Sequence, residues 1–192
     1  MSKALQMTSK GALGCLVEDI DLAQVSDEQM QLLKAAFAEH EVLFFENQSM
    51  VPAAHLAFAS RWGDININRF FTHVEGQPAI AQVVKEPQQQ GNIGGYWHTD
   101  HSYDQVPALG SMLLARQVPP TGGDTLFASC TKAFASLSKG MQEMLLTLTI
   151  DQPKQRTEIL PNKGKHFRKM EKQWMARSVL PILIVLSHWK RG

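Results

Sequence analysis

The sequence predicts an α+β domain in which short strands form a β-sandwich or barrel and helices lie outside it. Three observations favour this fold class. Short apolar runs are bounded by turn-forming residues, as strands are, and two segments place apolar residues at helical spacing. The 192 residues are 44% hydrophobic and 19% charged, a composition typical of one folded domain with a sizeable core.

The first elements are a strand and a helix. Residues 11–22 predict a short strand followed by a turn. The stretch "SDEQMQLLKAAFAEH" predicts a helix, because Ser26 or Asp27 can cap its N-terminus and apolar residues recur at helical spacing. These apolar residues are Met30, Leu33 and Phe37.

A buried strand and a second helix come next. The apolar run in "EVLFFENQ" predicts the strand. Pro52 suits the first position of the helix "PAAHLAFASRW", and Gly63 ends it. Residues 79–84, "AIAQVV", predict a further strand.

The second half of the chain begins with a polar loop at residues 86–95. After it, "GSMLLARQV" predicts a strand, "PPTGGD" a turn and "TLFAS" another strand. A helix is expected in "CTKAFASLSKGMQEMLLTL", which ends the clearly patterned part of the chain.

Charge is distributed unevenly along the chain. Residues 1–153 carry 9 Lys and Arg against 16 Asp and Glu, a net charge of −7, whereas residues 154–192 carry 10 against 2, a net charge of +8. A basic segment can bind nucleic acid or an anionic membrane, but no nucleic-acid-binding motif or basic amphipathic helix accompanies this one. We therefore expect neither partner, and we separate the domain of residues 1–153 from an atypical basic tail at 154–192.

Cysteine usage and hydropathy indicate the compartment. Cys15 and Cys130 lack the CxxC spacing of a zinc ribbon and offer no disulfide framework. The N-terminus lacks the apolar core of a signal peptide, and the longest apolar run, residues 179–186, is too short to cross a bilayer. These features predict a cytoplasmic protein with reduced thiols.

The segment "YWHTDHSYDQ" is the candidate metal site. In an extended segment, residues two apart face the same side, so His98 and Asp100 would point together. An imidazole and a carboxylate are two of the three ligands in the 2-His-1-carboxylate triad of Fe(II) oxygenases. The bare pair is weak evidence, because chance supplies about 0.3 His-x-Asp pairs in a chain of this composition. A structural histidine, hydrogen-bonded near a turn, is the alternative.

The neighbouring motifs are more specific. "WHTDHSY" is followed by "PALG" and then by "ARQVPPTGGDTLFA", and together these stretches resemble the TauD/TfdA family of Fe(II)- and 2-oxoglutarate-dependent dioxygenases. Nearer the N-terminus, "DIDLAQVSDEQ", "EHEVLFFENQ" and "AFASRWGD" resemble the family's opening helices and strand. The resemblance covers about residues 11–148.

The resemblance implies a double-stranded β-helix (jelly roll) with flanking helices. His98 and Asp100 match the family's first two iron ligands, and Thr125 matches the threonine that helps to hold the 2-oxoglutarate carboxylate. Trp97 and Tyr103 are expected to pack beside the site. The implied reaction uses O2 to hydroxylate a small organic substrate, through a ferryl species that abstracts a hydrogen atom.

The substrate positions differ from those of the family's taurine enzyme. An ungapped comparison puts Asn68 where that enzyme has histidine, Phe71 where it has tyrosine and Gly94 where it has asparagine. The resemblance therefore implies a substrate other than taurine. Asn68 also suits a turn, and Arg69 and His73 are interpreted as exposed surface charges or as contacts to an anionic substrate.

Two further family motifs have no counterpart in the sequence. These are the distal histidine that is the third iron ligand and the arginine that pairs with the far carboxylate of 2-oxoglutarate. His166 and His188 lie in the basic tail and are interpreted as solvated residues. One hypothesis explains the missing motifs and the charge change together: the tail is an out-of-frame product of a family gene. The encoding DNA tests it, since the two motifs should appear one base out, past Gly192.

Several alternatives stay open. The chain is either an active dioxygenase or a catalytically inactive, truncated homologue that acts as a binding module or has no function. The basic tail is either out of frame or native with a partner of its own. An incomplete jelly roll would expose sheet edges, which favours aggregation or a homo-oligomer. A cupin-like jelly roll with unrelated chemistry ranks last, because it does not explain "PPTGGDT".

Overall fold

The computed structural model describes residues 5–91, 97–100, 104, 106 and 108–148, together with the backbone of a strand at 182–186. Its strands are β1 (Gln6–Ser9), β2 (Cys15–Glu18), β3 (Val42–Phe45), β4 (His73–Val74), β5 (Gln77–Ala81), β6 (Gly110–Leu114) and β7 (Ile182–Leu186). Its helices are the 3₁₀ turn η1 (Leu22–Gln24), α1 (Asp27–His40), α2 (Pro52–Ser60), α3 (Cys130–Ala135) and α4 (Lys139–Thr147).

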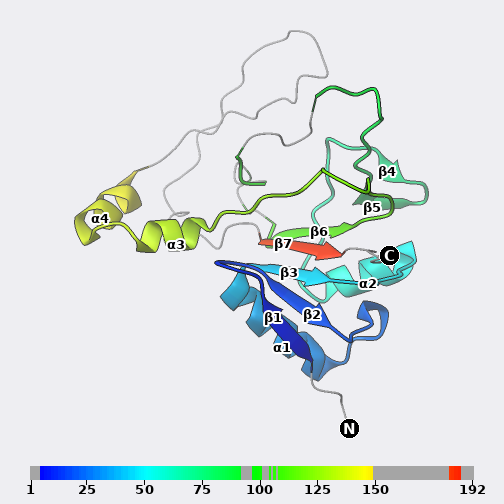
Figure 1. Cartoon of the computed structure of the whole chain (residues 1–192), viewed down its shortest axis with the longest axis horizontal. Helices are drawn as coiled ribbons and strands as arrows, with labels where there is room; N and C mark the ends of the chain where they lie inside the picture. Colours follow the sequence, from blue (N-terminus) through cyan, green and yellow to red (C-terminus); the bar gives the residue numbers. More distant parts are fainter. Residues whose placement is uncertain are drawn as a thin grey trace.

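Five of the strands form one mixed sheet in the order β1-β2-β3-β7-β6, and β4 and β5 form a separate hairpin. The first pair, β1 and β2, is antiparallel, and the remaining neighbours in the sheet are parallel. Figure 1 shows α1 along the β1–β3 side of the sheet, with α3 and α4 extending away from it. The predicted mixture of helices and strands is confirmed, and the jelly roll stays a prediction.

The core lies between the first strands and the two longer N-terminal helices. Among the described residues, every fully buried apolar side chain comes from residues 15–58. Strands β2 and β3 are buried at consecutive positions and not only at alternate ones, which is typical of parallel strands covered on both faces. The predictions of a strand in residues 11–22 and of a buried strand in "EVLFFENQ" are confirmed.

Helix α1 forms as its sequence predicts, and its cap is Ser26 and not Asp27. The Ser26 hydroxyl accepts from the Gln29 N–H at 3.2 Å, and the Gln29 side-chain oxygen accepts from the Ser26 N–H at 3.0 Å. This reciprocal capping box satisfies backbone donors at the helix start that have no partner within the helix. The predicted apolar face is buried at Met30, Leu33 and Phe37.

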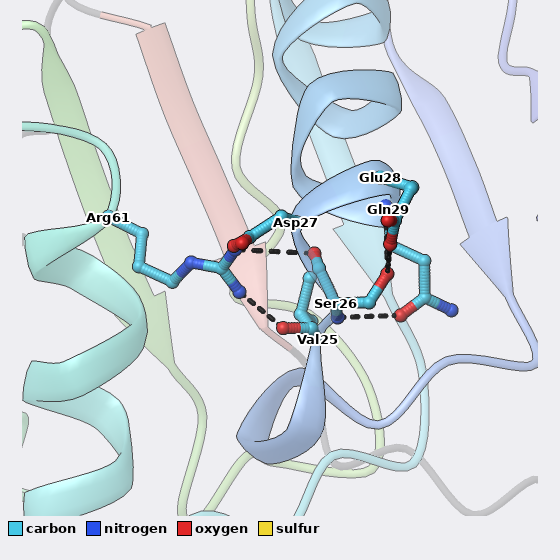
Figure 2. A network of polar contacts seen from close by, with 6 residues as sticks. All are labelled: Val25, Ser26, Asp27, Glu28, Gln29 and Arg61. Atoms are coloured by element: carbon cyan, nitrogen blue, oxygen red, sulfur yellow. Dashed lines mark hydrogen bonds and ion pairs between the residues drawn. The ribbon is translucent and has the colours of Figure 1, made fainter.

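Arg61, which follows α2, ties that helix to the start of α1, as Figure 2 shows. Its guanidinium donates to the backbone carbonyls of Val25 and, at 3.3 Å, of Ser26. It also pairs with the Asp27 carboxylate. Helix α2 itself begins at Pro52 as predicted, and it ends at Ser60, shortly before Gly63.

The predicted strand in "TLFAS" is wrong, since residues 125–129 have no regular secondary structure. Phe127 of this segment contacts the sheet, and Ser129 contacts the residue that precedes β3. The Phe127 ring lies edge-on to the Phe44 ring of β3, with the centroids 6.2 Å apart. The Ser129 hydroxyl donates to the Glu41 carboxylate at 2.7 Å, and Lys132 donates to the Ala12 carbonyl. Side-chain packing against β3 thus takes the place of strand pairing.

Two other predicted elements have different bounds in the structure. The helix expected in "CTKAFASLSKGMQEMLLTL" is divided into α3 and α4, because the Ser138 hydroxyl caps a new helix by accepting from the Met141 N–H. The strand expected at 79–84 is β5, which begins at Gln77 and ends at Ala81. Strands β1, β4 and β7 were not predicted. In "PPTGGD", the backbone bends at Pro120 and Thr121, and Gly122 and Gly123 both have positive φ.

Candidate functional site

Strand β6 fixes one side of the candidate site. Successive residues of a strand face opposite sides, and Met112 and Leu114 of β6 pack against the buried core. Ser111 and Leu113 therefore project from the opposite side of the strand, and Leu113 is 43% exposed. Parallel pairing with β7, in which Ser111 lies opposite Leu183, holds the backbone of β6 in place.

His98 and Asp100 come together beside this strand, as the sequence predicts. His98 Nε2 lies 3.3 Å from Asp100 Oδ1, and the two side chains are 51% and 49% exposed. The second carboxylate oxygen, Asp100 Oδ2, accepts a hydrogen bond from the Ser111 hydroxyl at 3.2 Å. Segment 97–100 has no regular secondary structure, so side-chain contacts orient these groups.

The two donor atoms fit a metal ion placed between them. Ligand nitrogen and oxygen atoms lie about 2.1 Å from a divalent transition metal, so two of them at right angles are about 3.0 Å apart. The observed 3.3 Å is close to that separation. Imidazole and carboxylate are also the donor types of non-haem iron sites. An ion pair between a protonated His98 and Asp100 would have the same distance, so metal binding itself must separate the two interpretations.

The described part of the chain supplies two such ligands. No group of three His, Cys, Asp or Glu side chains gathers around a common point among the residues that the structure describes. His166 and His188, which were interpreted as solvated, lie outside the described residues. The predicted domain boundary at residue 153 lies outside them as well.

A second loop is joined by an ion pair to the candidate metal-site segment, "YWHTDHSYDQ". Arg69 Nη2 lies 3.1 Å from Asp104 Oδ1, and the Asp104 side chain is only 17% exposed. Arg69 is thus partnered by a carboxylate four residues after Asp100. The Arg69 side chain is 59% exposed and paired with Asp104 at the same time.

The Asn68 side chain forms hydrogen bonds within its own turn. Its side-chain oxygen accepts from the Phe70 and Phe71 N–H groups at 2.8 and 3.2 Å, which is the hydrogen-bond pattern of an Asx turn. The imidazole of His73 contacts the Asn68 carbonyl at 2.8 Å. The interpretation of Asn68 as a turn residue is therefore supported, and Phe71 is half-buried in the same turn.

Of the remaining predicted residues, the structure describes Thr125 and Trp97. Thr125 is exposed and, within the described residues, makes no hydrogen bond or ion pair with His98 or Asp100. Trp97 is 70% exposed, so the expectation that it packs beside the site is wrong. Gly94 and Tyr103 lie outside the described residues.

Sequence reasoning missed two residues: Ser111, which contacts Asp100, and Asp104, which pairs with Arg69. Ser111 lies within the predicted strand "GSMLLARQV", where alternation with Met112 and Leu114 would have placed it on the side away from the core. Asp104 lies within "YWHTDHSYDQ" but belongs to no His-x-Asp pair. Its partner, Arg69, is 35 residues away in sequence, and no local pattern reveals such a pairing.

A hollow of about 300 Å³ elsewhere on the surface is structural. Its buried polar group is Gln48, which accepts from the Leu22 N–H at 3.0 Å and donates to two backbone carbonyls at 2.9 Å. The side-chain amide of Gln48 thus connects the chain after β3 to η1. The hollow is lined by Ile20, Asp21, Asn47, Gln48 and Ser49.

The sequence profile described as "Taurine catabolism dioxygenase TauD, TfdA family" matches residues 7–177. The chain belongs to the TauD/TfdA family. The matched range includes the His98–Asp100 segment and the turn before Thr125.

Relatives of this TauD/TfdA chain include an alpha-ketoglutarate-dependent sulfonate dioxygenase of Saccharomyces cerevisiae. That protein is 29% identical over 159 residues, which are 77% of this chain and 38% of its own length. An (S)-phenoxypropionate/alpha-ketoglutarate-dioxygenase of Delftia acidovorans is 30% identical over 162 residues, which are 76% of this chain and 53% of its own length. The chain therefore spans about half the length, or less, of these curated relatives.

Solved structures give the same likeness at the level of the fold. The crystal structure of a taurine dioxygenase from Burkholderia xenovorans matches with a TM-score of 0.61 at 24% identity, over 79% of this chain and 55% of that chain. A second structure from the same organism, 26% identical, has the same TM-score. Within the described part of this TauD/TfdA chain, no helix combines the length and apolar character needed to cross a bilayer.

Proposed function

We propose that the chain is an Fe(II)- and 2-oxoglutarate-dependent dioxygenase that hydroxylates a small organic substrate. The observation that carries the proposal is the His98–Asp100 pair, whose donor atoms lie 3.3 Å apart at the positions of the family's iron-ligand motif. Membership of the TauD/TfdA family supports 2-oxoglutarate as the co-substrate. Because the chain spans about half the length of its relatives, its activity is part of the proposal.

The residues have separate roles in this proposal. His98 Nε2 and Asp100 Oδ1 hold the iron, and Thr125 helps to bind a carboxylate of 2-oxoglutarate. Fe(II) and 2-oxoglutarate, when bound, supply with O2 the oxidant that converts a C–H bond to C–OH. The half-exposed side chains of His98 and Asp100 leave the donor pair open to a co-substrate. The family's third ligand, the distal histidine, has no counterpart that we identify in the sequence.

The proposed architecture is the jelly roll with flanking helices, supported by the fold of the solved relatives. Residues 1–153 form its part of the dioxygenase domain, and residues 154–192 are the atypical basic tail. The family profile extends to residue 177 and so crosses this boundary. The sequence of the encoding DNA tests whether the tail is out of frame. A cytoplasmic location and assembly into a homo-oligomer belong to the same proposal.

The substrate class we propose is a small organic acid other than taurine. Named relatives act on a sulfonate, a phenoxypropionate and a sulfate ester, each of which carries an anionic group. Asn68, Phe71 and Gly94 stand at the three positions that we assign to the substrate. The Asn68 amide oxygen is used within its own turn, so this position does not offer the imidazole that the taurine enzyme has there.

A catalytically inactive homologue that binds a small molecule is the second candidate. It is favoured by one observation: within the described residues, two metal donors gather and not three. Fewer protein ligands weaken metal binding, and a co-substrate carboxylate left unpaired in a desolvated site costs roughly 2–5 kcal/mol.

Succinate release separates the two candidates. The purified chain is supplied with Fe(II), 2-oxoglutarate, O2 and a panel of small organic acids that includes taurine. We expect succinate above the no-substrate background with at least one acid other than taurine, and a fall to background in His98→Ala. His40→Gln, at the end of α1, is the matched control and should retain the wild-type rate. Equal succinate from wild type and His98→Ala would overturn the proposal.

A further inference from the structure

We infer that Ser111 is a positioning residue, which holds Asp100 Oδ2 so that Asp100 Oδ1 is directed at the metal position shared with His98. The inference rests on the proposed function of the His98–Asp100 pair. It is based on the different partners of the two Asp100 carboxylate oxygens. Oδ1 lies 3.3 Å from His98 Nε2, and Oδ2 accepts a hydrogen bond from the Ser111 hydroxyl at 3.2 Å.

Ser111 lies on a regular strand, whereas the segment that contains Asp100 has no regular secondary structure. Residues 97–99 have no regular structure and Asp100 lies in a bend, whereas Ser111 is the second residue of β6. The backbone of β6 is paired in parallel with β7, and the next side chain, Met112, packs against the core. A hydroxyl on a strand anchored in this way limits where the Asp100 carboxylate can turn.

The hydrogen bond from Ser111 restrains the orientation of the Asp100 carboxylate. The terminal torsion of aspartate is broad and two-fold, so an unrestrained carboxylate exchanges or tilts its oxygens readily. An ionised carboxylate only accepts hydrogen bonds, and the Ser111 hydroxyl donates one to Oδ2. Without that donor, Oδ2 is free to compete for a metal position that a co-substrate needs. Loss of such outer contacts typically costs 10–100-fold in metal affinity or activity.

The test compares two variants that differ in the hydroxyl alone. Ser111→Thr keeps the hydroxyl and Ser111→Val replaces it with a methyl group, and both β-branched residues suit a strand. Co(II) alone is titrated anaerobically, and the intensity of its visible bands is followed, because it reports coordination independently of turnover. We expect Ser111→Val to bind Co(II) roughly tenfold more weakly than wild type, with altered band intensities, and Ser111→Thr to stay within about threefold.

Ser60→Ala is the control for loss of a serine hydroxyl, because that hydroxyl bonds to the Leu56 carbonyl in α2, outside the metal-site segment. It should bind Co(II) as wild type does. Equal affinities and spectra for Ser111→Val and Ser111→Thr would overturn the inference, as would equal weakening of both in folded protein. Absence of Co(II) binding by wild type would instead overturn the proposed function, so the two failures are distinguishable.

Discussion

His55 is half-buried on α2, and its surroundings lower the pKa of its imidazole below the ordinary value of 6.5. Burial is the larger cause, and the positive charge of Arg116 adds to it. Between pH 6.5 and the lowered pKa, the unfolded chain therefore binds more protons at this residue than the folded chain does. The free energy of unfolding should fall as the pH falls through this interval, and His55 adds no pH dependence above it.

Replacing the imidazole by a neutral amide removes this titration. We expect His55→Gln to show a flatter dependence of unfolding free energy on pH below 6.5 than wild type, measured by urea denaturation at a series of pH values. Parallel curves for the two proteins would show that His55 does not couple folding to protonation.

The site residues differ in how far the sequence reveals them. His98 and Asp100 are recognisable because their spacing and flanking motifs are local. Ser111 lies 11 residues away from Asp100, and its contact depends on which side of β6 faces the segment. Arg69 and Asp104 are 35 residues apart, so only the folded chain brings their charges together. Local sequence thus predicts the donors of the site but not the contacts that orient them.

The Arg61 guanidinium connects α2 to the start of α1 by donating hydrogen bonds to backbone carbonyls. Arg61 is 29% exposed and bonds to the Val25 and Ser26 carbonyls, whereas its carboxylate partner, Asp27, is 95% exposed. Removing the guanidinium leaves partly buried carbonyls without their donor, at a cost of about 1–3 kcal/mol. Removing the Asp27 charge alone affects an exposed ion pair worth less than about 1 kcal/mol.

We therefore expect Arg61→Met to destabilise the protein clearly more than Asp27→Asn does, as measured by urea unfolding at neutral pH. Both variants keep the approximate length of the side chain, so packing changes are small. If the two substitutions cost the same, the ion pair and not the carbonyl contacts would hold these helices together.

Helices and strands were predictable where the sequence shows both a periodic apolar pattern and residues that mark the ends of the element. Helix α1 has apolar spacing and a capping box, and β3 is an uninterrupted apolar run. By contrast, "TLFAS" has the composition of a strand, yet Phe127 packs on Phe44 and no ladder forms. Whether an extended segment finds a strand partner is decided by distant parts of the chain. The break between α3 and α4 was readable in principle, because Ser138 is a good cap.

Across the whole molecule, the buried core and the candidate site lie in different parts of the chain. Among the described residues, the fully buried apolar side chains come from residues 15–58, whereas the proposed metal donors and Thr125 come from residues 98–125. Strand β6 joins the two parts, since Met112 and Leu114 contact the core while Ser111 contacts Asp100. The sequence predicted the family and the mixture of helices and strands, but the order of strands in the sheet depends on long-range pairing that local patterns do not contain.

In the proposed function, His98 and Asp100 hold an iron ion to which 2-oxoglutarate binds. The most direct test is an anaerobic titration of the chain with Fe(II) and 2-oxoglutarate, in which the visible charge-transfer band between iron and the keto acid is followed. We predict a saturable band in wild type that is lost in His98→Ala, with circular dichroism confirming that both proteins are folded. No band from folded wild-type protein, or an undiminished band in His98→Ala, would contradict the claim.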